Sequence, residues 1–224
     1  MFAPLAVDVN RINIKRSVTD HYTGSSMNRR DLLALTPAIL LSGCSSSPEQ
    51  KTPPKPVEPV TGLHALYQMY QYSRTWAQDL AVVRCSSIDI TQVKPEPGKA
   101  AAWQAVFASP SLGRQRAYTF SVYDASVSLR QGIFADAPTP LASDAHSFQL
   151  AAARTDSDQA WETALKHAAE YAGKNPNMPI SYILEMGRNV SDPVWRVIWG
   201  ESVTSSVYSV LVDASSGEYA ETLH

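Results

Sequence analysis

The side chains that could carry out nucleophilic or acid–base chemistry are few and far apart in this chain. Its 224 residues include two cysteines, Cys44 and Cys85, and five histidines. A thiolate is a strong nucleophile, and two facing carboxylates can act as general acid and general base in a hydrolysis. Glu185 and Glu201 would form such a pair only if folding brought them together. The fold therefore decides whether any of this chemistry is available.

No sequence motif for a metal, a cofactor or a nucleophile is present. No histidine stands at metal-ligand spacing from a second histidine or from paired carboxylates. Gly-x-Ser-x-Gly, His-Glu-x-x-His, Cys-x-x-Cys and glycine-rich phosphate loops are absent as well. We therefore predict no metal site, no cofactor and no enzymatic activity. A hydrolase that uses dispersed carboxylates such as Glu185 and Asp213 is kept as an alternative. We prefer a structural role for Asp213, because an aspartate at a strand end accepts hydrogen bonds from turn amides.

Cys44 stands at the end of a short apolar run. The run covers residues 32–41, which is half of the roughly 20 residues that a membrane-spanning helix needs. Arg29 and Arg30 precede the run, and the small residues Ser42 and Gly43 separate it from Cys44. A basic start, an apolar core of about 7–15 residues and small residues at its end are typical of a secretory signal. A buried helix is the alternative, but a proline at position 37 would break it.

The stretch Leu41-Ser42-Gly43-Cys44 resembles the lipobox of bacterial lipoproteins. The resemblance implies that residues 27–43 are a signal peptide and that Cys44 becomes the lipidated first residue, with palmitate among its acyl chains. It also implies a protein anchored to a membrane of the bacterial cell envelope, facing the periplasm or the exterior. Arg29 and Arg30 resemble in addition a twin-arginine motif, which implies export in the folded state; general secretion is the other route.

Met27 lies two residues before the arginine pair, close to where a signal peptide begins. We therefore expect residues 1–26 to be an upstream extension from a misplaced start. The first 43 residues hold five of the 19 basic and three of the 21 acidic residues, which leaves 14 and 18 and a net charge of −4. An acidic chain without a basic run is a poor binder of nucleic acid, so no nucleic-acid partner is predicted. With Cys44 lipidated, Cys85 has no disulfide partner, and we predict it to be a small strand residue.

Two similar segments follow a tether. Residues 44–62 are rich in proline and serine and predict an extended tether. Residues 63–134 predict one helix and several strands, residues 135–156 a linker, and residues 157–224 a second helix and strands. The first helix has an apolar face made of Leu66, Met69, Tyr70, Ser73, Trp76, Ala77 and Leu80. The second is expected to be capped by Ser157 or Asp158 and to stop at Gly173.

The strands of the two segments correspond. Trp103–Phe107 matches Trp195–Trp199, and Tyr118–Ser126 matches Tyr208–Ser215 with a slip of one residue. We infer an internal duplication and predict an α+β fold of two similar units, each with one helix packed on a small antiparallel β-sheet. Neither unit is large, so the two are expected to share a core or to pack their sheets together.

The second segment resembles a PepSY-type domain, on the residues Val212-Asp213-Ala214-Ser215-Ser216-Gly217-Glu218 and the strand before them. The resemblance implies a helix on a small antiparallel sheet, an exported or membrane-attached setting, and an inhibitory or binding role without catalytic residues. The first segment departs from this pattern, because Asp124-Ala125-Ser126 lacks the turn glycine.

The tryptophans are the remaining indication of a binding site. We predict that Trp161 and Trp195 belong to the core. Trp195 and Trp199 lie four residues apart on one strand face, and two indoles on a small face predict that one of them lines a surface groove. The predicted function is a lipid-anchored, non-enzymatic binding module for a peptide or protein partner. A protease-inhibitory or chaperone-like module and the hydrolase described above are the alternatives.

Overall fold

The computed structural model describes residues 57–187 and 192–224. The predicted lipidation residue Cys44 and the signal residues Arg29, Arg30, Leu41, Ser42 and Gly43 lie outside the described residues, and these predictions remain untested. The described part is an α+β fold with two α-helices and an antiparallel sheet, as predicted.

The elements run in the order β1 (Val60–Thr61), α1 (Gly62–Ser73), β2 (Ala81–Ile88), β3 (Lys99–Ala100), β4 (Ala102–Ser109), β5 (Arg114–Ser121), β6 (Gly132–Ala135), β7 (Thr139–Pro140), a 3₁₀ turn (Leu150–Ala152), α2 (Ser157–Lys174), β8 (Ile180–Met186), β9 (Pro193–Trp199), β10 (Tyr208–Asp213) and β11 (Tyr219–Leu223).

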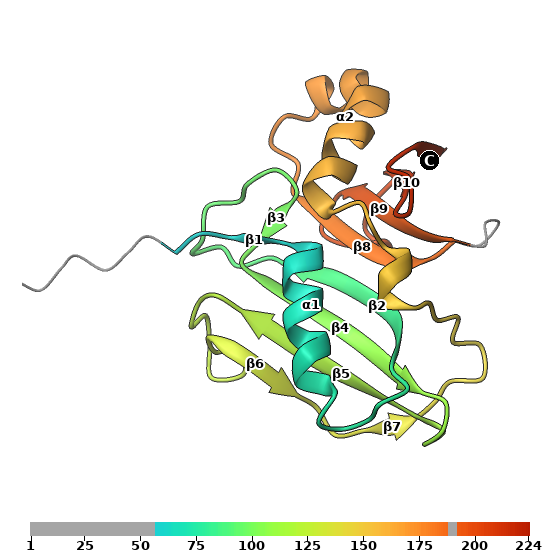
Figure 1. Ribbon diagram of the computed structural model, residues 1–224. Coiled ribbons are helices and arrows are strands. Elements are labelled where there is room, and N and C mark those ends of the chain that lie inside the picture. Colours follow the sequence, from blue (N-terminus) through green and yellow to red (C-terminus); the bar gives the residue numbers. More distant parts are fainter. Residues whose placement is uncertain (1–56, 188–191) are drawn as a thin grey trace, which may run out of the picture. The chain divides into compact units, whose positions relative to one another are not determined.

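One antiparallel sheet contains the strands of both segments (Figure 1). Its order is β11-β10-β9-β8-β2-β4-β5-β6, with β7 paired to β5, while β1 and β3 form a separate pair. The two halves join where β2 meets β8, at the pairs Arg84–Glu185, Cys85–Leu184 and Ser86–Ile183. The first strand of one unit therefore pairs with the first strand of the other.

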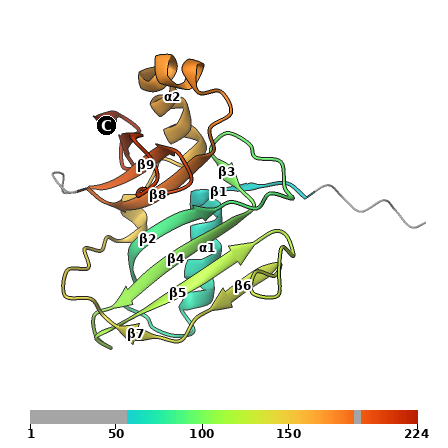
Figure 2. The same cartoon turned by 180° about the vertical axis from the view of Figure 1, so that it is seen from behind.

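Both helices pack on the same face of this sheet. Helix α1 contacts β2, β4 and β5, and α2 contacts β9, β10 and β11. Cys85 pairs with Ala105 on one side and with Leu184 on the other, and all three belong to one buried cluster. The two units therefore share a core, the first of the two predicted arrangements. Figure 2 shows the opposite face of β2, β4 and β5, with α1 behind the strands.

The two helices have the same burial pattern. The fully buried positions of α1 include Gly62, Ala65, Met69 and Ser73, and those of α2 are Ser157, Ala160, Ala164 and Ala168. Each member of the second set lies 95 residues after its counterpart. After each helix, four strands also lie side by side in the large sheet in chain order, β2-β4-β5-β6 after α1 and β8-β9-β10-β11 after α2. This repetition supports the inferred duplication.

The strand register corrects one detail of the predicted correspondence. Trp103 pairs with a residue of β5 that lies four residues before Asp124. Trp195, its counterpart in β9, pairs with a residue of β10 that lies one residue before Asp213. The two aspartates are therefore not equivalent, because β5 ends before Asp124 whereas Asp213 is still part of β10.

Helix α1 is shorter than the apolar spacing predicted. It ends at Ser73, and Trp76, Ala77 and Leu80 reach the core from the connection to β2. The hydroxyl of Ser73 donates to the Tyr70 carbonyl at 2.8 Å, and the hydroxyl of Thr75 donates to the Tyr72 carbonyl at 2.9 Å. Such hydroxyl contacts compete with the helical hydrogen bonds and favour termination.

Parts of the predicted tether and linker belong to the fold. Residues 60–61, at the end of the predicted tether, form β1, and the Val60 carbonyl accepts from the Trp103 indole at 3.1 Å. In the segment predicted as a linker, Phe148 is buried and exchanges two backbone hydrogen bonds with Val82. An aromatic side chain and paired backbone groups hold this segment against the start of β2, a central strand of the sheet, and the polar composition of the segment gave no sign of this.

The N-termini of the two helices meet. Asp156, rather than Ser157 or Asp158, caps α2 and completes a capping box with Gln159, and the helix continues one residue past Gly173. The Asp156 carboxylate also accepts from the backbone N–H of Leu63 in α1 at 2.8 Å. The Ser157 hydroxyl accepts from the Gly62 N–H at 2.7 Å. These side chains satisfy first-turn N–H groups of both helices.

Candidate functional site

The indoles of Trp195 and Trp199 do not line a surface groove, so that prediction is wrong. Trp195 is fully buried and its Nε1 donates to the Thr155 carbonyl at 2.8 Å. Trp199 is 1% exposed and packs edge to face against Tyr208. Both face the side of the sheet that α2 covers, and that helix closes the groove the sequence suggested.

Asp213 has the structural role that the sequence predicted. Its Oδ1 accepts from the backbone N–H groups of Ser215 and Ser216 at 2.7 and 3.1 Å, and from the Ser215 hydroxyl at 2.6 Å. Burial raises the pKa of Asp213, but these hydrogen bonds outweigh it and the net shift is downward. Gly217 adopts φ +80°, which this turn requires.

The two carboxylates of the hydrolase alternative are separated by a strand. Glu185 in β8 and Asp213 in β10 both pair with Val194 of β9, which places them on one face about 10 Å apart along the sheet. Glu185 lies 3.9 Å from Arg84, and Asp213 is held in its turn. Cys85 is a buried strand residue as predicted, and burial raises the pKa of its thiol.

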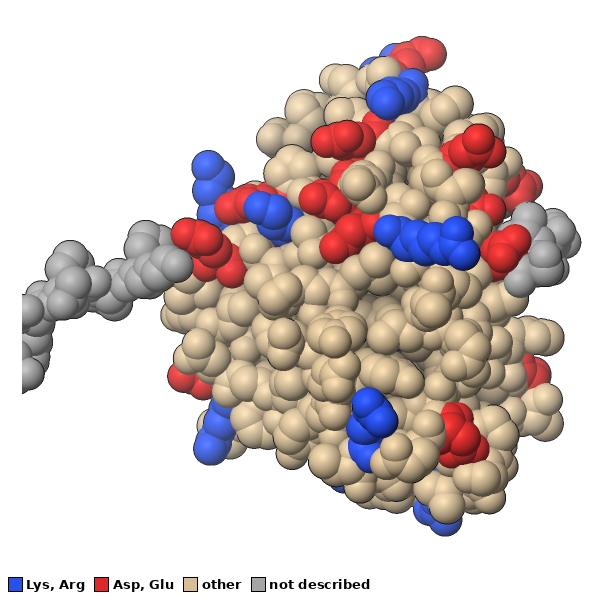
Figure 3. All heavy atoms as spheres, in the orientation of Figure 1, with Lys and Arg blue, Asp and Glu red and all other residues tan. Residues whose placement is uncertain are grey.

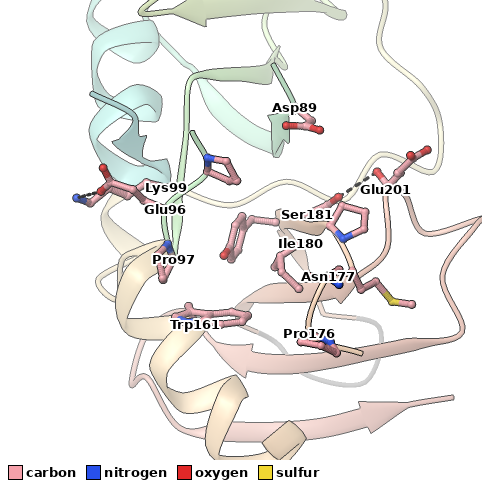
Figure 4. Close-up of a pocket in the computed structure, with 14 residues that line it drawn as sticks. Asp89, Glu96, Pro97, Lys99, Trp161, Pro176, Asn177, Ile180, Ser181 and Glu201 are labelled. Atoms are coloured by element: carbon pink, nitrogen blue, oxygen red, sulfur yellow. Dashed lines mark hydrogen bonds and ion pairs between the residues drawn. The ribbon is translucent and has the colours of Figure 1, made fainter. Parts of the chain in front are cut away.

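A cleft of 430 Å³ opens beside the N-terminal half of α2 (Figure 4). Four segments form its walls: the β2–β3 connection with the start of β3, the first turns of α2, the α2–β8 connection with the start of β8, and the β9–β10 connection. Its lining residues are Asp89, Pro95, Glu96, Pro97, Lys99, Trp161, Pro176, Asn177, Met178, Pro179, Ile180, Ser181, Tyr182 and Glu201.

Buried hydrogen bonds fix the β2–β3 wall of the cleft. The Gly98 N–H donates to the Tyr182 hydroxyl at 2.8 Å, and the Gly98 carbonyl accepts from Ser157. Burial raises the pKa of Tyr182 to about 12, so its hydroxyl stays neutral. Gly98 has φ +72°, and a Cβ at this position would lie 2.1 Å from the Asp158 Cα. Only glycine allows this loop to approach α2 so closely.

Trp161 forms the aromatic wall of the cleft. It is half-buried, with its ring 5.6 Å from that of Trp199, rather than enclosed in the core as predicted. The indoles of Trp103 and Trp195 donate hydrogen bonds to carbonyl groups, but that of Trp161 has no acceptor among the described residues. A ligand carbonyl could therefore accept from it.

Four prolines, at positions 95, 97, 176 and 179, complete the apolar lining. Because each proline ring fixes φ near −65°, these walls lose little conformational freedom on binding. The cleft therefore has proline-rich walls that are rigid on two sides, and it contains an indole N–H without an acceptor among the described residues.

Acidic groups dominate the cleft margin. Asp89, Glu96 and Glu201 supply three carboxylates against the single ammonium of Lys99. Lys99 lies 2.8 Å from Glu96, and this contact raises the pKa of the lysine. Asp89 and Glu201 form no ion pair with any described residue. Two carboxylates therefore remain available for a cationic ligand.

The surface over α1 carries fewer charges than the margin of the cleft. Helix α1 contains no charged residue and exposes Tyr67 and Tyr72, and Figure 3 shows few charges over that half of the molecule. The charged side chains gather instead in a band over the half that contains α2.

Sequence reasoning missed the cleft because its walls are distant in the chain. The prolines at 95 and 97 are about 80 residues away from those at 176 and 179. The excess of prolines in two connections was the available signal. Trp161 was assigned to the core because its helical spacing matches the apolar face.

Within residues 57–187 and 192–224, no group of three or more His, Cys, Asp or Glu side chains could hold a metal ion. No α-helix in that part of the chain is long and apolar enough to cross a membrane.

The chain was compared with protein-family models, with curated proteins and with solved structures, and none of them matches it.

Proposed function

We propose that this protein is a lipid-anchored, non-enzymatic binding module of the bacterial cell envelope, and that its cleft binds an extended segment of a peptide or protein partner. The observation that carries the proposal is the open cleft in which Trp161 faces rigid proline-rich walls. Its volume of 430 Å³ falls in the range of about 300–1,000 Å³ that is usual for ligand sites.

The lining favours a peptide over a small polar metabolite. Aromatic side chains beside prolines bind extended peptides, whose backbone carbonyls accept from an indole N–H. Trp161 offers that donor, and Tyr182 is held in place by Gly98. Because the walls are already ordered, binding costs little conformational entropy.

The anchor rests on the sequence, in which a lipobox-like stretch ends at Cys44 and a proline-rich segment follows. The described chain begins beside the cleft. Pro59 lines a small hollow of 60 Å³ that shares Asp89, Pro95 and Glu201 with it. The first described residues therefore lie on the same side of the fold as the cleft.

Metabolic labelling with a palmitate analogue tests the anchor. We expect label on the wild type and on Cys85→Ala, and none on Cys44→Ala. Cys85→Ala is the matched control because it removes the chain's other thiol. Label retained by Cys44→Ala would contradict the anchor.

Site-specific photo-crosslinking in intact cells tests the cleft. A photoreactive amino acid at Asn177, an exposed cleft residue, is compared with one at Gln78, an exposed residue outside the cleft. We expect protein or peptide adducts from position 177 that are absent from position 78. Equal adduct patterns, or none from position 177, would count against peptide binding in the cleft.

A further inference from the structure

We propose that the ligand of this cleft is an extended cationic peptide in which prolines lie next to lysine or arginine. This inference rests on the proposed function and deepens it by naming the chemical class of the partner. It follows from two features at opposite ends of the cleft, the free carboxylates and the indole (Figure 4).

The charge of the ligand follows from Asp89 and Glu201. Lys99 is engaged by Glu96, so the one cation of the lining does not neutralise these two carboxylates. An anionic peptide would meet uncompensated negative charge, whereas a lysine or arginine would form charge-assisted hydrogen bonds. Acidic groups around a low-dielectric cleft also attract cationic ligands over a distance and raise their association rate.

The proline content follows from the shape and chemistry of the other end. Trp161 presents an indole face and a free N–H beside Pro97 and Pro176. A polyproline II segment fits such a surface, since it is already extended, loses little entropy and leaves its carbonyls unpaired. Ligand prolines would stack on Trp161 while their carbonyls accept from its N–H.

Fluorescence anisotropy with the full chain and three labelled peptides tests the inference. The probe is Pro-Pro-Lys-Pro-Pro-Lys-Pro-Pro. In one comparison peptide glutamine replaces lysine, and in the other glycine replaces proline. We expect the probe to bind at least tenfold more tightly than either, and its affinity to fall as salt is raised.

Substitutions of cleft residues test whether the probe peptide binds in the cleft. Asp89→Asn with Glu201→Gln should weaken probe binding about tenfold. Asp144→Asn with Glu218→Gln removes the same charge outside the cleft and should leave binding unchanged. Trp161→Phe keeps an aromatic ring but loses the N–H and should weaken binding of the probe, whereas Trp76→Phe, outside the cleft, should not.

The outcomes separate this inference from the proposed function. If none of the three peptides binds, the proposed peptide site fails and the inference with it. If the neutral peptide binds as tightly as the probe and the Asp89/Glu201 variant is unaffected, the cleft is a peptide site but the inference about charge is wrong. If the glycine peptide binds as tightly as the probe, the inference about proline is wrong.

One further experiment shows whether a partner or this chain itself supplies the ligand. Residues 51–56 of this chain read Lys-Thr-Pro-Pro-Lys-Pro, which is the composition that the cleft favours. If a partner supplies the ligand, Lys51→Gln with Lys55→Gln leaves probe affinity unchanged. An affinity that rises about tenfold in this variant would show that the chain's own segment competes for the cleft, and would overturn the assignment to a partner.

Discussion

Trp103 and Trp195 meet edge to face at the junction of the two halves, with ring centroids 6.1 Å apart. They come from β4 and β9, which are separated in the sheet by β2 and β8. The backbones of β4 and β9 are therefore about 14 Å apart, and the two indoles reach over the central strands to touch. Corresponding residues of the repeat thus form the centre of the shared core.

We expect the contact between Trp103 and Trp195 to require a glycine at position 62. A Cβ at position 62 would lie 2.4 Å from Trp195 Cη2 and 3.0 Å from Trp103 Cη2. Gly62→Ala should lower the free energy of unfolding by about 1–3 kcal/mol through overpacking, measured by urea denaturation. In the control Gly173→Ala the added Cβ meets nothing within 4 Å, and helix propensity should raise stability by up to about 1 kcal/mol. Equal effects of the two substitutions would contradict the steric explanation.

Ser157→Ala should uncouple the two helix N-termini. The Ser157 hydroxyl is fully buried, accepts from the Gly62 N–H and donates to the Gly98 carbonyl. Its removal leaves both backbone groups without a partner, at an expected cost of about 1–3 kcal/mol in a thermal or urea transition. Ser128→Ala, at an exposed position, should change stability by less than about 0.5 kcal/mol. A Ser157 variant as stable as that control would show that these hydrogen bonds contribute little.

Removing the hydroxyl group from two buried tyrosines should change the stability of the fold in opposite directions. Among the described residues, Tyr118 has the one buried side-chain polar atom without a hydrogen-bond partner. Tyr118→Phe should therefore leave the unfolding free energy unchanged or raise it by up to about 1 kcal/mol. Tyr182→Phe leaves the buried Gly98 N–H unpaired and should lower it by about 1–3 kcal/mol. Destabilisation by both, measured by chemical denaturation, would mean that the Tyr118 hydroxyl does contribute.

Asp79 should contribute to stability in a way that depends on pH. The Ser109 hydroxyl and the Ser111 N–H donate to its carboxylate at 2.6 and 2.7 Å and lower its pKa from 3.8 to about 2. Because the folded-state pKa is depressed, this stabilisation is present above pH 4 and is lost as the pH falls towards 2.

Urea midpoints measured from pH 7 to pH 2 check this. Asp79→Asn should be less stable than the wild type above pH 4, and the difference should shrink at lower pH. Asp144→Asn is the control, since Asp144 makes no hydrogen bond or ion pair in the described part of the chain. A difference between wild type and Asp79→Asn that stays constant with pH would assign the effect to something other than this carboxylate.

Local features of the fold were predictable from the sequence. The two tryptophan-containing strands and the turn around Asp213 depend on residues close together in the chain, and the structure confirms them. Helix ends were predicted less well, because single side chains decide them. The Ser73 hydroxyl lies at the C-terminal end of α1, and the Asp156 carboxylate caps the N-terminal end of α2. The register between repeats could not be predicted, since it is set by hydrogen bonds between strands.

The candidate site was also predictable only in part from the sequence. Sequence periodicity correctly placed Trp195, Val197 and Trp199 on one strand face. Whether that face opens into a groove depends on where α2 packs, and α2 covers it. Trp161 has a core-like spacing, yet it lines the cleft because the wall opposite comes from residues 95–97, more than 60 positions earlier.

The sequence by itself determined the α+β class, the repeated order of helix and strands, and the predictions of export and lipidation at Cys44. These follow from composition and spacing within short segments. The tertiary structure decided that β2 and β8 join the units into one sheet, and that distant prolines, carboxylates and Trp161 meet at one cleft. Such contacts arise from the packing of segments far apart in the chain, which no local pattern encodes.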